Sequence, residues 1–197
     1  MIKRAVNTKL PHQYQKYVNM IASLFVADYT EQTKLLPIKR GVEFHPDIAP
    51  IDNLYFTLKN DVKLEIGGIP FDNLSFVCGT NSRSQCECVV FPHDSDQHSW
   101  VLFAELKYRQ HNNNFNRGHI KKAIRQVYRT RYYYMQEGII SLRNTSYLII
   151  SFPLQRVPFK GFTPTQAQLM KLKRDKNIIL AFTNTISVID QKSLKIV

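Results

Sequence analysis

The sequence predicts a single α/β domain with a mixed central β-sheet flanked by helices. Segments with helical and strand periodicity alternate along the chain, several apolar runs have the length of buried strands, and no internal repeat interrupts them. With 197 residues, one domain can bury a substantial core. These observations define the order in which the elements are expected.

The first expected element is a long helix over about residues 12–29. Apolar side chains recur there at helical spacing, at Tyr14, Tyr17, Val18, Ile21, Leu24 and Phe25. Strands are then expected at residues 54–58, 62–66 and 74–78, with Gly67-Gly68 as a turn.

A β-hairpin follows at about residues 85–108. Two runs rich in Val and Phe are separated by a polar, turn-forming segment, and each run contains a carboxylate, Glu87 in the first and Glu105 in the second. Because side chains alternate between the faces of a strand, Glu105 and Lys107 project to the same side. The second run is otherwise apolar, as in strands covered on both faces, so these charges need an explanation, either a functional site or a structural ion pair.

A Glu-x-Lys at the end of a buried strand, with an acid on the partner strand, resembles the PD-(D/E)xK nuclease superfamily. The resemblance implies a restriction-endonuclease-like core that binds Mg²⁺, for which Mn²⁺ can substitute. It makes Glu87 and Glu105 metal ligands, adds the main-chain carbonyl of Leu106 as a further ligand, and gives Lys107 the role of assisting the attacking water or the scissile phosphate. Gln126 matches an auxiliary polar residue on the following helix of the family. Two carboxylates also suit Mg²⁺ on chemical grounds, because this ion typically takes one or two of them together with waters and phosphate oxygens.

The first motif departs from the family pattern in two ways. It lacks the Pro, and Glu87 stands where Asp is usual. Asp72, in Pro70-Phe71-Asp72, is therefore the second choice for the first acid, and Asp94 and Asp96 in the turn are the third. Glu43 and Glu65 are further acids for which no spacing argument exists.

A basic helix is expected at about residues 117–135. Its cations are Arg117, Lys121, Lys122, Arg125, Arg129 and Arg131, and no acid occurs between Glu105 and Glu137. The first five are candidates for nucleic-acid binding, since side chains four residues apart share a helix face and can follow phosphates. The alternative is a solvated outer helix face, and the tyrosines at 128 and 132–134 either stack on bases or pack the helix.

The C-terminal part predicts a central strand at residues 147–152 and a helix with Thr163 as N-cap that ends near Asp175. Strands at residues 178–182 and 185–189 follow. His111 and His119, on either side of an Asn-rich loop, are weaker candidates for a general base.

Composition limits the partners. Lys and Arg number 27 against 15 Asp and Glu, a net charge of +12 that favours a polyanion. The absence of a signal peptide or transmembrane segment predicts a cytoplasmic protein without a membrane partner. Three cysteines, Cys78, Cys86 and Cys88, do not suggest a disulfide framework, and a zinc site with His93 or His98 lacks the usual spacing.

The sequence and the resemblance together predict a Mg²⁺-dependent endonuclease that hydrolyses phosphodiester bonds of DNA, with RNA less favoured. Restriction-type and resolvase-like enzymes both fit, and the resemblance allows a homodimer. The alternative is a catalytically inactive, nuclease-fold module that binds nucleic acid. The third hypothesis is a protein that binds an acidic protein partner.

Overall fold

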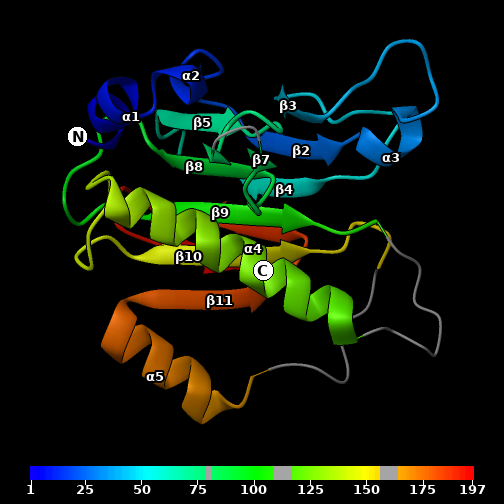
Figure 1. Ribbon diagram of the computed structural model, residues 1–197. Helices are drawn as coiled ribbons and strands as arrows, with labels where there is room; N and C mark the ends of the chain where they lie inside the picture. The colour runs from blue at the N-terminus through cyan, green and yellow to red at the C-terminus, as the bar shows by residue number, and fades with distance from the viewer. Residues whose placement is uncertain (79–80, 109–116, 156–163) are drawn as a thin grey trace.

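The computed structural model describes residues 1–78, 81–108, 117–155 and 164–197 (Figure 1). In chain order its helices and strands are α1 (Ile2–Lys9), α2 (Pro11–Tyr14), β1 (Val18–Met20), β2 (Leu24–Asp28), α3 (Thr30–Thr33), β3 (Val42–Pro46), β4 (Phe56–Lys59), β5 (Ile66–Pro70), β6 (Val77–Cys78), β7 (Asn81–Ser82), β8 (Cys88–Pro92), β9 (Val101–Leu106), α4 (Arg117–Gln136), β10 (Ser146–Ser151), α5 (Gln166–Lys176), β11 (Ile178–Phe182), β12 (Thr185–Val188) and β13 (Leu194–Ile196).

A mixed six-stranded sheet forms the centre, in the order β1-β5-β8-β9-β10-β11. Strands β5, β8 and β9 are antiparallel neighbours, whereas β10 runs parallel to both β9 and β11. Helix α4 connects β9 to β10 and crosses one face of the sheet (Figure 1). The expected α/β class, the hairpin, the basic helix and the central strand after it are confirmed.

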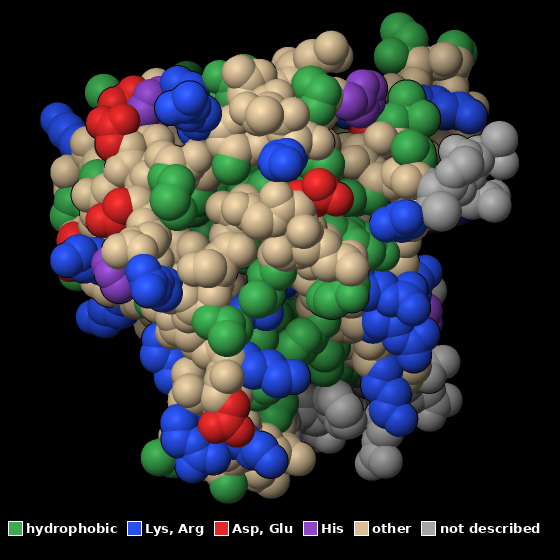
Figure 2. Space-filling view, turned by 60° about the vertical axis from the view of Figure 1, so that its left-hand side comes forward, with side chains coloured by type: hydrophobic (Ala, Val, Ile, Leu, Met, Phe, Trp, Pro, Cys, Tyr) green, Lys and Arg blue, Asp and Glu red, His purple; other side chains and the backbone are tan. Residues whose placement is uncertain are grey.

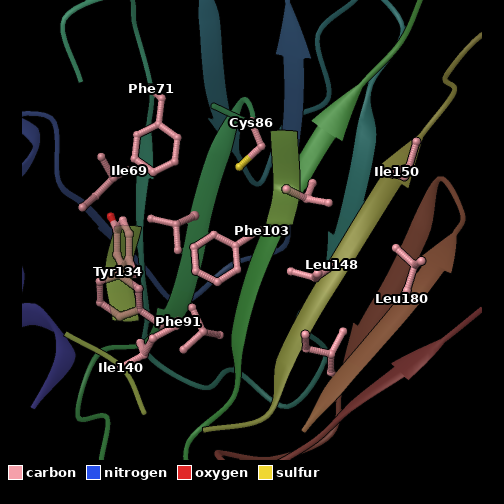
Figure 3. Packing of buried hydrophobic residues seen from close by; sticks show 14 of the residues in the cluster. Ile69, Phe71, Cys86, Phe91, Phe103, Tyr134, Ile140, Leu148, Ile150 and Leu180 are labelled. Carbon is pink, nitrogen blue, oxygen red and sulfur yellow. The ribbon is translucent and has the colours of Figure 1, made fainter. Parts of the chain in front are cut away.

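The face below α4 is packed with apolar side chains. Val101 and Phe103 of β9 join Leu148 and Ile150 of β10 in a core that is closed by Tyr134 of α4. Figure 3 shows Phe103, Leu148, Ile150 and Tyr134 in this core. Val101, Phe103 and Glu105 are two residues apart along β9, so their side chains lie on the same face of the strand. Glu105 therefore continues this row. The Glu105 side chain is therefore directed toward the helix side of the sheet.

A second, five-stranded sheet covers the opposite face, in the order β13-β12-β4-β2-β3. Leu24 and Val26 of β2 pack in one core with Leu102 and Ala104 of β9. This sheet was not predicted from the sequence. It explains why β9 is apolar on both faces, since one face meets helices and the other meets a sheet.

The expected helix over residues 12–29 is wrong. Only α2 (Pro11–Tyr14) is helical there, and the segment continues as β1 and β2. Leu24 and Val26 are fully buried while Phe25 between them is only partly buried, which is the period of a strand. Helical spacing of the apolar residues was misleading because a continuous apolar run fits both periods.

Three smaller expectations also change. Residues 62–65 lie outside any strand, and Gly67 and Gly68 lie within β5 instead of forming a turn. The C-terminal helix has Thr165 as its N-cap, with a capping box to Gln168, instead of Thr163. Residue 163 and the loop at residues 111–116, which contains His111, lie outside the described residues.

Gly67→Ala should destabilise the protein by about 1–3 kcal/mol, as expected for overpacking. A Cβ at Gly67 would collide with the ring of Tyr17, which also hydrogen-bonds His93. Urea denaturation measures the loss. Gly41→Ala is the matched control, because no atom lies within 4 Å of a Cβ there. Equal stabilities of the two variants would contradict close packing at Gly67.

No helix among the described residues is long and apolar enough to cross a membrane.

Candidate active site

Glu105 and Lys107 meet at the C-terminal end of β9. The Glu105 side chain is fully buried, and the Lys107 ammonium forms an ion pair with its Oε1. Within the described residues no hydrogen-bond donor reaches Oε2, so this oxygen is buried without a donor. Lys107 keeps 21% of its side chain exposed and is therefore the more accessible member of the pair. Leu106 between them directs its side chain into the opposite core.

Glu87 lies on the neighbouring segment, immediately before β8. Its N–H donates to the carbonyl of Ala104 (2.9 Å), and its carbonyl accepts from the N–H of Phe71 (2.8 Å). These bonds fix the Glu87 backbone between β5 and β9, beside the end of β9 that carries Glu105. Glu87 is mostly buried, with part of its surface exposed. The structure thus brings together the three principal residues expected from the sequence.

The electrostatics of the three groups are coupled. Burial raises the pKa of Glu105 to about 7, although Lys107 opposes this shift. Burial, and then repulsion from Glu105, raise the pKa of Glu87. Burial lowers the pKa of Lys107, but the neighbouring carboxylates outweigh it and the net shift is upward. When both carboxyl groups are ionised, their charge exceeds that of the single ammonium, and a bound cation would compensate the excess.

Two further residues at this site were not found from the sequence. Asp28, at the end of β2, adds negative potential that affects Glu87, Glu105 and Lys107. Its N–H donates to the hydroxyl of Tyr108 (3.0 Å), which in turn donates to the carbonyl of Leu54 (2.7 Å). Tyr108 thereby connects the end of β9 to the second sheet. No local feature of the sequence places Asp28 at this site, because its position depends on the packing of the second sheet against β9.

Gln126 of α4 supports the segment before Glu87. Its Nε2 donates to the carbonyl of Gln85 (2.8 Å), whereas its buried Oε1 has no hydrogen-bond partner among the described residues. Thr130, one turn later, accepts from the N–H of Cys86 (2.8 Å). Both residues hold the chain that leads into Glu87, so Gln126 contributes to positioning through Gln85.

The other candidate acids have different partners. Asp72 forms an ion pair with Lys16 and accepts from Leu74 and Ser75. Asp96 caps the turn by accepting from the N–H of His98 (2.7 Å). Asp94 lies in the same turn, beyond the far end of β8, and Glu43 and Glu65 are engaged by Arg40 and Asn19. Of the acids considered from the sequence, Glu87 is the one on the segment that is hydrogen-bonded to the Glu105 end of β9.

The cations of α4 divide into two groups. Lys121, Lys122, Arg125 and Arg129 are exposed, and Lys122 is close enough for its charge to lower the pKa of Glu105. Arg131 is buried and donates to Ser146 and to the carbonyl of Lys176, so it is not one of the exposed cations of the helix. Arg117 begins the helix, but its side chain lies outside the described residues. Tyr134 is buried, Tyr132 is exposed, and Tyr128 and Tyr133 are intermediate.

The residues present fit a Mg²⁺ ion. No group of three or more His, Cys, Asp or Glu side chains arranged for a metal occurs in the described part of the chain. Mg²⁺ does not need such a group, because it usually keeps several waters and takes one or two carboxylates. Glu105 has a buried oxygen that accepts no hydrogen bond, and it lies beside a second carboxylate. These two carboxylates can serve as the ligands that Mg²⁺ takes from a protein. Cys86 and Cys88 are buried free thiols and belong to the cores on opposite faces of the sheet.

Comparison with known proteins adds no relative: no protein-family model matches the chain, and no curated protein or solved structure is significantly similar to it.

Proposed function

We propose that the protein is a metal-dependent nuclease that hydrolyses phosphodiester bonds of DNA, with Glu87, Glu105 and Lys107 at its active site. The observation that carries this proposal is the fully buried Glu105, which pairs with Lys107 through one oxygen and leaves the other without a donor. A buried carboxylate is costly unless a cation or hydrogen bonds compensate it. Structural ion pairs are usually satisfied more completely, so the incomplete shell supports a ligand role.

Each residue has a distinct role in this proposal. Glu105 and Glu87 hold Mg²⁺ or Mn²⁺, which when bound supplies Lewis-acid activation of water and of the phosphoryl group. Lys107, partly exposed, stabilises negative charge that develops on the scissile phosphate. The exposed cations of α4 contact the DNA backbone and position it without reading its sequence.

A catalytically inactive nucleic-acid-binding module is the second candidate. One observation favours it: Lys107 already neutralises one oxygen of Glu105, so the ion pair can stabilise the site without a metal. This module would bind nucleic acid through α4 in a salt-sensitive manner but would not cleave it.

Lys107→Ala should abolish metal-dependent nicking of supercoiled plasmid DNA. Loss of the ammonium removes stabilisation of the developing charge, an effect of several kcal/mol that corresponds to about a hundredfold or more in rate. Cleavage of plasmid and of a branched DNA is measured with Mg²⁺, Mn²⁺ or EDTA. Lys39→Ala, an exposed lysine in the loop before β3, is the matched control and should cleave normally.

The outcomes separate the two candidates. Metal-dependent nicking by wild type and Lys39→Ala, lost in Lys107→Ala, supports the nuclease, and the preferred DNA distinguishes restriction-type from resolvase-like activity. Intact DNA with every metal, despite salt-sensitive binding, supports the inactive module. Cleavage that survives in Lys107→Ala, or that persists in EDTA, contradicts the proposed site.

A further inference from the structure

A groove with a volume of about 540 Å³ lies between α4 and α5. Its apolar lining includes Ile124 and Tyr128 of α4, Leu172 of α5 and Leu180 of β11. Lys171, Lys176 and the acid Asp175 of α5 also line it. The groove therefore combines an apolar surface that contains an aromatic ring with cations at its border.

Helix α5 is held in place without filling this groove. It has no buried residue, and Met170 is 63% exposed. The helix is stabilised at its ends, by the Thr165–Gln168 capping box and by Asn177 in a left-handed C-cap. Arg131 of α4 donates to the carbonyl of Lys176 (2.9 Å), which ties the C-terminal end of α5 to α4. Leu169 and Leu172 pack against the main core, and these polar contacts fix the ends of the helix.

Both helices bordering the groove are strongly cationic. Helix α4 exposes Lys121, Lys122, Arg125 and Arg129 and contains no acid. Helix α5 exposes Lys171, Lys173, Arg174 and Lys176. Its single acid, Asp175, is engaged by Arg174 (2.7 Å). In the lower half of Figure 2, Lys and Arg side chains lie on both sides of a hollow that contains hydrophobic side chains.

We propose that this α4–α5 groove binds a single-stranded segment of nucleic acid. The cations contact successive phosphates, and an unpaired base packs against the ring of Tyr128 and the side chain of Leu172. Single-strand binding surfaces combine a positively charged groove with aromatic side chains on which bases stack. A duplex would satisfy the cations but leave the apolar lining uncovered, because its bases are stacked inside the helix.

The groove also has a defined relation to the candidate active site. Helix α4, which carries Ile124 and Tyr128 of the groove, also carries Gln126, whose side chain donates to the carbonyl of Gln85 in the segment that leads into Glu87. The consequence for catalysis rests on the proposed function: the preferred substrate of the nuclease contains an unpaired strand. Binding in the groove itself requires no metal.

The test measures binding of two fluorescein-labelled probes, an oligo(dT) of 20 nucleotides and a 20-base-pair duplex. Fluorescence anisotropy reports the binding, in EDTA and at several salt concentrations. Lys171→Glu/Lys176→Glu should weaken single-strand binding at least tenfold. It should also reduce the slope of log K against log salt by about 1.4, for two lost phosphate contacts. Tyr128→Leu should weaken binding about fivefold or more, since stacking on an aromatic ring is lost.

The matched control is Lys59→Glu/Lys195→Glu, which makes the same charge change at exposed positions of the second sheet. It should retain most of the affinity. Equal weakening by the two double variants would overturn the groove as the binding site. Duplex binding as tight as single-strand binding, or displacement of the oligonucleotide by polyglutamate of equal charge, would overturn the assignment of its occupant.

Failure of the groove and failure of the nuclease remain distinguishable. Groove-dependent binding in EDTA without cleavage in Mn²⁺ supports the groove and contradicts the nuclease. Cleavage in Mn²⁺ of oligo(dT) with the same KM in wild type and Lys171→Glu/Lys176→Glu contradicts the groove and leaves the nuclease intact.

Discussion

Glu105→Gln should reduce the proposed metal-dependent DNA cleavage by at least about a thousandfold, since loss of a carboxylate proposed to hold the metal would remove several kcal/mol of transition-state stabilisation. The amide has the shape of the carboxylate, so the buried position can be filled without a cavity. It lacks the negative charge that attracts the cation and pairs with Lys107. Initial rates on supercoiled plasmid with saturating Mn²⁺ measure the effect.

The stability of the wild-type protein should depend on pH through Glu105, and the same variant removes this dependence. The pKa of Glu105 rises from an ordinary 4.5 to about 7 in the folded protein, chiefly because of burial. The folded state therefore holds this proton more tightly than the unfolded state. The contribution of Glu105 to stability is fully present below pH 4.5 and is lost as the pH rises to 7. The loss amounts to at most about 3 kcal/mol.

Gln does not titrate, so Glu105→Gln should gain stability relative to wild type between pH 4.5 and 7. Urea denaturation in EDTA at pH 5 and pH 8 measures the difference. Glu137→Gln, at an exposed position just after α4, is the control and should alter neither cleavage nor the pH profile. Full cleavage by Glu105→Gln would remove Glu105 from the proposed site. A pH-independent stability difference would contradict its burial as a carboxylate.

The central part of the site was predictable because its signals are local. Glu87, Glu105 and Lys107 lie in one hairpin, and alternation along β9 alone places Glu105 and Lys107 on one face. The contribution of Asp28 was not predictable in the same way. It depends on packing of the second sheet against β9, and β2 was mistaken for part of a helix. Contacts between distant segments have no local sequence signal.

The basic helix shows a similar division between local and distant information. Its extent followed from the periodicity of residues 117–135, and the structure places it at Arg117–Gln136. Whether a particular cation faces solvent depends on neighbouring elements. Arg131 is buried because Ser146 of β10 and the end of α5 supply its acceptors. A charge pattern on a helix thus predicts an exposed face as a whole, but neighbouring elements decide whether a particular cation is buried.

Tyr134→Ala should destabilise the protein by about 3–5 kcal/mol, the range for removal of a buried aromatic side chain. The Tyr134 ring is fully buried and packs against Phe71, Phe76 and Phe103, as Figure 3 shows in part. Its hydroxyl hydrogen-bonds Oε1 of buried Gln13 (3.0 Å). The variant leaves a cavity where α4 meets β9, and urea denaturation measures the loss.

Two control variants distinguish the contribution of the buried Tyr134 ring from that of its hydroxyl and from that of an exposed tyrosine on the same helix. Tyr134→Phe removes only the hydroxyl and leaves Gln13 Oε1 without this donor, so it should cost about 1–2 kcal/mol. Tyr132→Ala alters an exposed tyrosine of the same helix and should change stability by about 0.5 kcal/mol or less. A loss in Tyr134→Ala no larger than that in Tyr132→Ala would contradict the placement of α4 on the sheet. Because α4 also carries Gln126 and Thr130, a correctly placed helix is the condition for holding Glu87 beside the Glu105 end of β9.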